Sequence, residues 1–278
     1  MTTTHDQPTR APQRYTPQAN PAPVTLPRVL SSEWVKLRSL RSSWITMILA
    51  VAGLVVVAIA GGILTNQDWS HMRPRELARF EPIGQSLTGI NFSQLAIGVL
   101  GVLFITGEYG TGMIRSSLAA APRRLPVLWA KAILFATVTF VLMELSAFLA
   151  FLTGQAALAS HGTTLAAAGA LRATVGTGLY LTVVALLGVG LGFIIRSTAG
   201  GIAALFGLLL VLPGILAILP QTWQDNIGPY LPSNAGAAIY TVKPDTTSLS
   251  PWTGFAVFCL YAAVALGVAA LVLKRRDA

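Results

Sequence analysis

Long apolar stretches alternate along the chain with shorter polar connections. Six of the stretches are long enough to cross a hydrocarbon core of about 30 Å, which takes roughly twenty helical residues. They are residues 44–64, 87–107, 132–153, 173–195, 199–219 and 252–273. The second has the least defined start, because its first residues, SLTGINFSQ, are polar. The pattern predicts an all-α membrane protein, with one six-helix domain over residues 28–278.

The segment before the first span divides into a tail and a helix. Residues 1–27 contain six prolines and no sustained apolar pattern, which predicts a disordered cytoplasmic tail and no signal peptide. Next, Leu30, Trp34 and Leu37 recur at helical spacing and form one apolar stripe. The polar surround of this stripe consists of Glu33, Lys36, Arg38 and Arg41. We expect an amphipathic helix in the lipid interface; a simple extension of the first span is the alternative.

The positive charge of the chain is unevenly divided between the two sides of the predicted bundle. The chain carries 19 Lys and Arg against 10 Asp and Glu, a formal net charge of +9. Six spans put both termini on one side, and that side collects fourteen of the 19 cations. Because positive residues near span ends are retained in the cytoplasm, we expect both termini to be cytoplasmic. Topology thus explains the basic balance, and we expect no nucleic-acid partner.

Residues suited to catalysis are sparse. Cys259 stands alone inside the sixth span, and the three histidines are scattered without metal-ligand spacing. None of the four lysines belongs to a Gly-Lys-Ser/Thr phosphate-binding loop. We therefore expect this chain to have no enzyme activity, no metal site and no cofactor site.

Glu144 is the one ionisable residue well inside a predicted span. An unpaired carboxylate at that depth costs about 2.5 kcal/mol or more, so Glu144 must face protein or water. Two interpretations remain open. The residue is either a polar point on a transport pathway or a buried group that fixes helix packing.

The connection between the second and third spans, GEYGTGMIRSSLAAAPRRLPVLWAK, is polar and rich in glycine and cations. Its middle, TGMIRSSLAA, predicts a short cytoplasmic helix in which Ile114 and Leu118 lie one turn apart. An apolar tip turned away from the membrane requires a protein partner to cover it. A lipid-facing or solvated loop is the alternative.

This connection resembles the one between the second and third helices in permease subunits of type-2 ABC transporters, particularly the small actinobacterial exporters. The resemblance rests on an acidic-aromatic pair, a Thr-Gly-x-Ile-Arg core and a basic turn. Here these are Glu108 with Tyr109, Thr111 to Arg115, and Arg123 with Arg124. Two further stretches are similar to the same family, SSEWVKLRSLRSSW before the first span and YLPSNAGAAI in the outer loop before the last.

The resemblance implies a division of labour in a bacterial plasma membrane. Two permeases, either two copies of this chain or this chain with a sister permease, form the pathway, and cytoplasmic ABC ATPase subunits bind ATP and Mg beneath them. It assigns ATPase coupling to Glu108, Tyr109, Thr111, Gly112, Ile114, Arg115 and Leu118. It places the interfacial helix, with Trp34, Lys36, Leu37 and Arg38, on the same partner.

Two other functions remain as alternatives. A membrane scaffold or immunity subunit that transports nothing would share the topology and the ATPase contact. An intramembrane enzyme that used Glu144 as an acid or base would need a second catalytic group at similar depth, and the sequence offers none.

Overall fold

The computed structural model describes residues 25–39, 41–113 and 125–275, and the regular elements in these ranges are all helical. Six helical segments there are long and apolar enough to cross a membrane. They are Arg41–His71, Pro82–Gly110, Leu125–His161, Ala170–Ile195, Thr198–Leu216 and Pro251–Arg275. Each overlaps one predicted span, so the expected all-α fold with six long apolar helices is confirmed.

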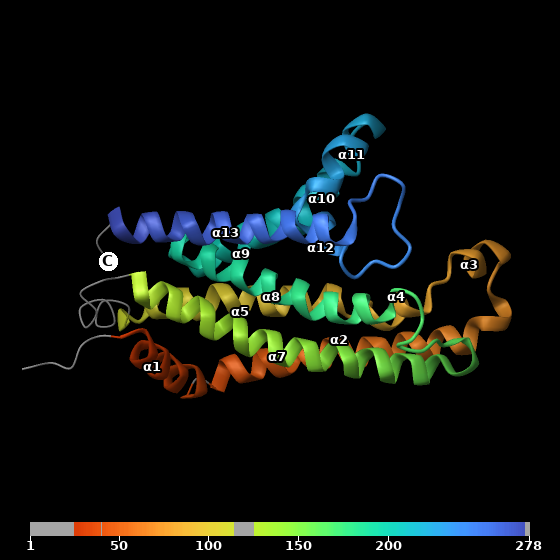
Figure 1. The fold of residues 1–278 in the computed structure, drawn as a ribbon, viewed down its shortest axis with the longest axis horizontal. Helices are drawn as coiled ribbons and strands as arrows, with labels where there is room; N and C mark the ends of the chain where they lie inside the picture. Colours follow the sequence, from red (N-terminus) through yellow and green to blue (C-terminus); the bar gives the residue numbers. More distant parts are fainter. Residues whose placement is uncertain (1–24, 40, 114–124, 276–278) are drawn as a thin grey trace, which may run out of the picture.

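The long helices lie roughly side by side (Figure 1). They are α2 (Arg41–Asp68), α5 (Ile90–Gly110), α7 (Leu125–Leu158), α8 (Ala170–Ile195), α9 (Thr198–Phe206) and α13 (Pro251–Arg275), preceded by α1 (Leu26–Ser39). The shorter elements are η1 (Trp69–His71), α3 (Pro74–Arg79), α4 (Pro82–Leu87), η2 (Ala159–His161), η3 (Gly207–Val211), α10 (Leu212–Leu216), α11 (Gln221–Ile227), η4 (Gly228–Tyr230) and α12 (Pro232–Ala237). We call the two ends of the bundle the α1 end and the α3 end.

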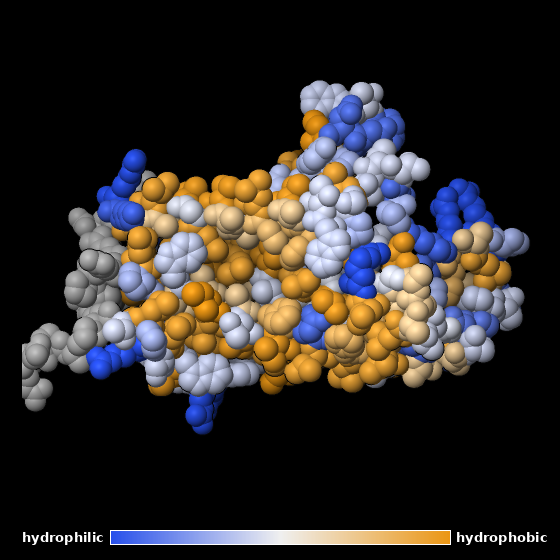
Figure 2. Space-filling model, in the orientation of Figure 1, coloured by the Kyte–Doolittle hydropathy of each residue, from blue (hydrophilic) through white to orange (hydrophobic). Residues whose placement is uncertain are grey.

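The surface of the bundle is apolar along its length. Large side chains such as Val56 of α2, Leu145 of α7 and Leu260 of α13 are exposed. On the face seen in Figure 2, hydrophobic residues cover the middle of the molecule, and hydrophilic residues gather toward its ends. A patch of this size faces lipid in a membrane protein, whereas a soluble protein would have to bury it.

Helix α8 forms the centre of the bundle. In its most apolar window 67% of the residues are buried, and it packs against α5, α7 and α13. Small residues permit close contact with α5: a Cβ atom added to Gly188 would lie 2.5 Å from the Gly98 carbonyl oxygen. The backbones of α5 and α8 therefore touch directly at these small residues.

The second span differs from the prediction at its start. Helix α4 begins at Pro82, five residues before the predicted boundary, because the Glu81 carboxylate accepts hydrogen bonds from the backbone N–H groups of Ile83 and Gly84. The helix is then interrupted at Gly89. A Cβ atom there would lie 2.6 Å from the Leu54 carbonyl oxygen, so the close approach of α2 requires glycine.

The fifth span is irregular around Pro213. Helix α9 gives way to the π-helical turn η3, and Pro213 stands in the first turn of α10. Proline has no N–H to donate to the preceding turn, so regular α-helical bonding cannot continue through it. Beyond this point α10 and α11 project away from the bundle (Figure 1).

The stretch YLPSNAGAAI was expected in an outer loop, but much of it is packed into the bundle. It contains α12, whose Gly236 lies so close to Tyr180 of α8 and Phe258 of α13 that a Cβ atom would clash with both rings. Arg172 of α8 donates hydrogen bonds to the carbonyls of Ala238, Ile239 and Thr241. Those carbonyls belong to the turns that follow α12, so Arg172 pairs backbone acceptors of an irregular segment and holds it against α8.

Candidate functional site

Four charged side chains meet at the α1 end of the bundle. Glu33 and Lys36 come from α1, Glu108 from the last turn of α5, and Lys131 from the beginning of α7. We call these four residues the ion cluster. It joins α1 to α5 and α7, the two helices on either side of the connection that the sequence linked to an ATPase.

Lys131 is the centre of the ion cluster. Its Nζ atom lies 2.5 Å from Oε2 of Glu33 and 2.6 Å from Oε1 of Glu108. Lys36 completes the set, donating to Oε1 of Glu33 at 2.8 Å and to Oε1 of Glu108 at 3.4 Å. The Lys131 ammonium also lies 5.0 Å from the centre of the Phe104 ring, within the range of a cation–π contact.

The ion cluster is buried at its centre, and its four charges balance. The side chains of Lys131 and Glu33 are 0% and 2% exposed, and two carboxylates face two ammonium groups. Burial of Lys36 acts to lower its pKa, but its hydrogen bond to Glu33 and the charges of Glu108 and Glu33 outweigh burial and raise the pKa. Removing one partner from such a group leaves an unpaired buried charge, which costs about 3–5 kcal/mol.

A second set of contacts joins the end of α5 to the turn between α8 and α9. The guanidinium carbon of Arg196, in that turn, lies 5.2 Å from the centre of the Tyr109 ring. Beside it, the Thr198 hydroxyl donates a 2.8 Å hydrogen bond to the Thr106 hydroxyl of α5. Glu108 and Tyr109 are adjacent in sequence, yet their side chains bind different parts of the molecule.

The structure describes only part of the predicted coupling segment. Thr111 is exposed and donates its hydroxyl proton to the carbonyl of Gly107 or Glu108, and Gly112 has a positive φ of 72° just after α5. Ile114, Arg115 and Leu118 lie outside the described residues, as does most of the predicted short helix.

The predicted amphipathic helix is present as α1, but Glu33 was placed wrongly. It was expected in the polar surround, and instead it is buried on the same side as Leu37. Trp34, expected on the apolar stripe, is 42% exposed, and Arg38 is exposed as predicted for a polar position. The reason is that the inner face of α1 meets Lys131, a buried cation that selects a carboxylate as its partner.

Sequence reasoning therefore missed Glu33 and Lys131 as site residues. Lys131 was counted as the last cation of the connection, with the third span beginning after it. Helix α7 in fact begins at Leu125, so Lys131 lies inside the helix. The available signal was its apolar context, LPVLWAKAILF, in which a lone lysine needs a nearby acid.

Glu144 is far from the ion cluster in sequence and faces α8. A Cβ atom added to Gly178 would lie 2.0 Å from the Oε2 atom of Glu144, so the glycine leaves the space that the carboxyl occupies. This oxygen has no hydrogen-bond partner within the described ranges. The contact agrees with the expectation that Glu144 faces protein, and both interpretations of its role stay open.

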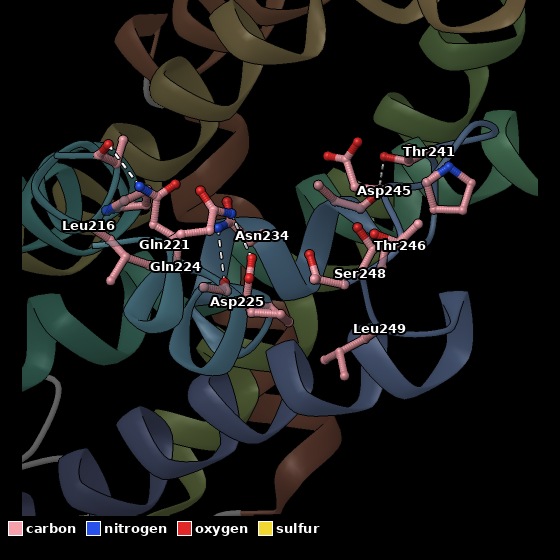
Figure 3. A pocket seen from close by; sticks show the side chains of 18 of the residues that line it. Leu216, Gln221, Gln224, Asp225, Asn234, Thr241, Asp245, Thr246, Ser248 and Leu249 are labelled. Carbon is pink, nitrogen blue, oxygen red and sulfur yellow. Dashed lines mark hydrogen bonds between the residues drawn. The ribbon is translucent and has the colours of Figure 1, made fainter. Parts of the chain in front are cut away.

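A cavity of about 580 Å³ lies among α10, α11, α12 and the connection that precedes α13. Figure 3 shows its polar lining, which includes Gln224, Asp225, Asn234 and Asp245. Several of these groups are already used to hold the local backbone, since Gln224 donates to the carbonyls of two residues that follow α10 and Asn234 donates to the carbonyl of Gly228. We call this cavity the α10–α12 pocket.

Comparison with known families and proteins adds to this geometry. Residues 29–219, more than half of the chain, match the family model described as ABC-2 family transporter protein. No curated protein matches the chain. In the parts of the chain that the structure describes, no group of three or more His, Cys, Asp or Glu side chains is placed to hold a metal ion.

Proposed function

Because the chain belongs to the ABC-2 family of transporter proteins, as a multi-pass membrane permease without ATPase activity of its own, we propose that it is the pathway-forming subunit of an exporter driven by separate cytoplasmic ATPase subunits. The ATPases bind ATP and Mg, and this chain needs neither. Two permeases, identical or sister chains, enclose the pathway in the plasma membrane.

The ion cluster is the observation that carries this proposal. An ATPase that closes on ATP moves whatever rests on it, and the movement is useful only if it reaches the membrane helices. Lys131 contacts both Glu33 and Glu108, so α1, the end of α5 and the start of α7 are held together. A push on the connection between α5 and α7 would therefore move three helices as one unit.

The charge distribution supports the orientation of the subunit. Fourteen of the 19 cations fall on the side that holds both termini of a six-span chain. We propose that this side, the α1 end, faces the cytoplasm. The α10–α12 pocket then lies toward the outer face, where an exported molecule leaves.

The fifth span is the least buried of the six, which suits pairing with a second permease. Within the chain 22% of its apolar window is buried, next to 28% for the first span and 33% for the third and sixth. Val211, Ile215 and Ile218 expose large apolar side chains on this segment. A partner permease across the pathway would cover part of this face.

Purification from the native host tests the proposal. The tagged chain, extracted in mild detergent, should bring down an ATPase with a phosphate-binding loop and show vanadate-sensitive ATP hydrolysis. In liposomes the complex should move at least one of a panel of labelled amphipathic compounds when ATP is added. A chain that brings down no ATPase contradicts the proposal; an ATPase complex that moves none of the panel favours the scaffold alternative.

A further inference from the structure

We propose that Arg196 is a positioning residue that carries movement from the end of α5 into α9, through a link that is separate from the ion cluster. The link consists of Arg196 against Tyr109 and of Thr198 against Thr106. This inference rests on the proposed function, because it names the route by which the ATPase would act on one particular span.

The first step concerns the two sides of the last turn of α5. Glu108 binds Lys131 and Lys36, which belong to α7 and α1. Tyr109 instead faces Arg196, in the turn between α8 and α9. A movement of this turn would therefore reach two groups of helices, one through a buried ion network and one through a cation–π contact.

The second step concerns the backbone of Arg196. Its φ of 57° is left-handed, a conformation that suits glycine and strains a residue with a side chain. It ends α8, with its N–H donating to the Gly192 carbonyl. Glycine would form this turn with less strain, so the turn alone does not account for arginine; the arginine supplies a guanidinium that contacts Tyr109.

The third step concerns α9, which contacts α5 at its first residue and is followed by an irregular turn. The hydroxyl of its first residue, Thr198, is hydrogen-bonded to that of the buried Thr106, so the start of α9 would move together with α5. The helix is little buried and runs into the π-helical turn Gly207–Val211, followed by Pro213. Such a break is a natural point of bending, whereas the regular and buried α8 would stay in place.

The test uses labelling of a cysteine at Val211, which is exposed on η3, in a Cys259→Ser chain purified with its ATPase. The rate of reaction with a thiol reagent is compared without nucleotide and with ATP and vanadate. We expect the rate to change at least severalfold with an intact link. Arg196→Gly, which favours the turn but removes the guanidinium, should abolish most of this change while ATPase association and hydrolysis persist. Arg196→Lys keeps the cation and should keep the change.

The remaining outcomes are also decisive. If Arg196→Gly retains the full nucleotide-dependent change, the inference is wrong. If that variant does not accumulate in the membrane, Thr198→Val replaces it, since it removes the second contact and keeps the shape; an unaltered change in Thr198→Val likewise overturns the link. Failure of the proposed function looks different, because then no ATPase purifies with the chain that carries an intact Arg196.

Discussion

Substituting Lys131 by methionine would leave the carboxylates of Glu33 and Glu108, which are 2% and 12% exposed, facing the single ammonium of Lys36. The volume of the side chain is nearly preserved, so the change tests the charge rather than the packing. Losing one partner of a buried ion pair costs about 3–5 kcal/mol. Adding Glu33→Gln restores the balance, because Lys36 and Glu108 remain 3.4 Å apart as a neutral pair. We expect the double variant to recover about 1–3 kcal/mol of the loss, a coupling typical of residues in one network.

Thermal unfolding of the purified chain in lipid nanodiscs measures this difference. In chains of 150–250 residues each kcal/mol moves the midpoint by about 2–4 °C, so Lys131→Met alone should lower it on the order of 10 °C. Lys274→Met is the matched control, since Lys274 is an exposed cation in the last turn of α13 and its loss should shift the midpoint little. If the effects of Lys131→Met and Glu33→Gln simply add, the two charges do not interact and the ion cluster does not join the helices.

Three further predictions follow from contacts described above. Gly188→Ala should destabilise the chain by about 1–3 kcal/mol in the same assay, whereas Gly267→Ala, where a Cβ meets nothing within 4 Å, should not. Gly178→Ala should be destabilising because its Cβ enters the space of the Glu144 carboxyl, and Glu144→Ala in the same chain should relieve part of the loss; no relief would mean that the two residues do not meet. A cysteine at His161, in a chain without its native cysteine, should react with an impermeant thiol reagent in intact cells. Reaction only after the cells are opened would reverse the proposed orientation.

The six long helices were predictable because a single requirement dominates them. Residues in contact with lipid must be apolar, and this requirement produces continuous apolar stretches in the sequence, such as 252–273. The turn at Arg196 was also predictable from neighbouring residues, because only three polar residues separate two spans and the chain must reverse direction there. Helix ends were less predictable. The polar stretch SLTGINFSQ covers the end of α4, the break at Gly89 and the start of α5, and α4 itself starts at its Glu81 cap.

The ion cluster was not predictable from the sequence because its partners are far apart. Glu33 and Lys131 are separated by 98 residues, and the sequence around each gives no indication of its partner. A charge count treats Lys131 as solvated in a loop, which is right for an exposed lysine and wrong for one that meets two carboxylates. The position of α12 was not predictable for the same reason. Its six residues are too few to give the apolar pattern of a span, and their place depends on contacts with Arg172, Tyr180 and Phe258, which are distant in sequence.

The separation of Glu33 and Lys131 also has a consequence for how the protein is made. At a translation rate of about 5–20 residues per second, Glu33 emerges roughly 5–20 s before Lys131, the partner 98 residues later. During that interval the carboxylate must stay hydrated at the membrane surface, so α1 cannot settle onto the bundle. A chain cut short before α7 never receives its lysine and keeps α1 undocked. Docking of α1 therefore waits for the third span, and an undocked α1 distinguishes a chain that still lacks α7 from one that already has it.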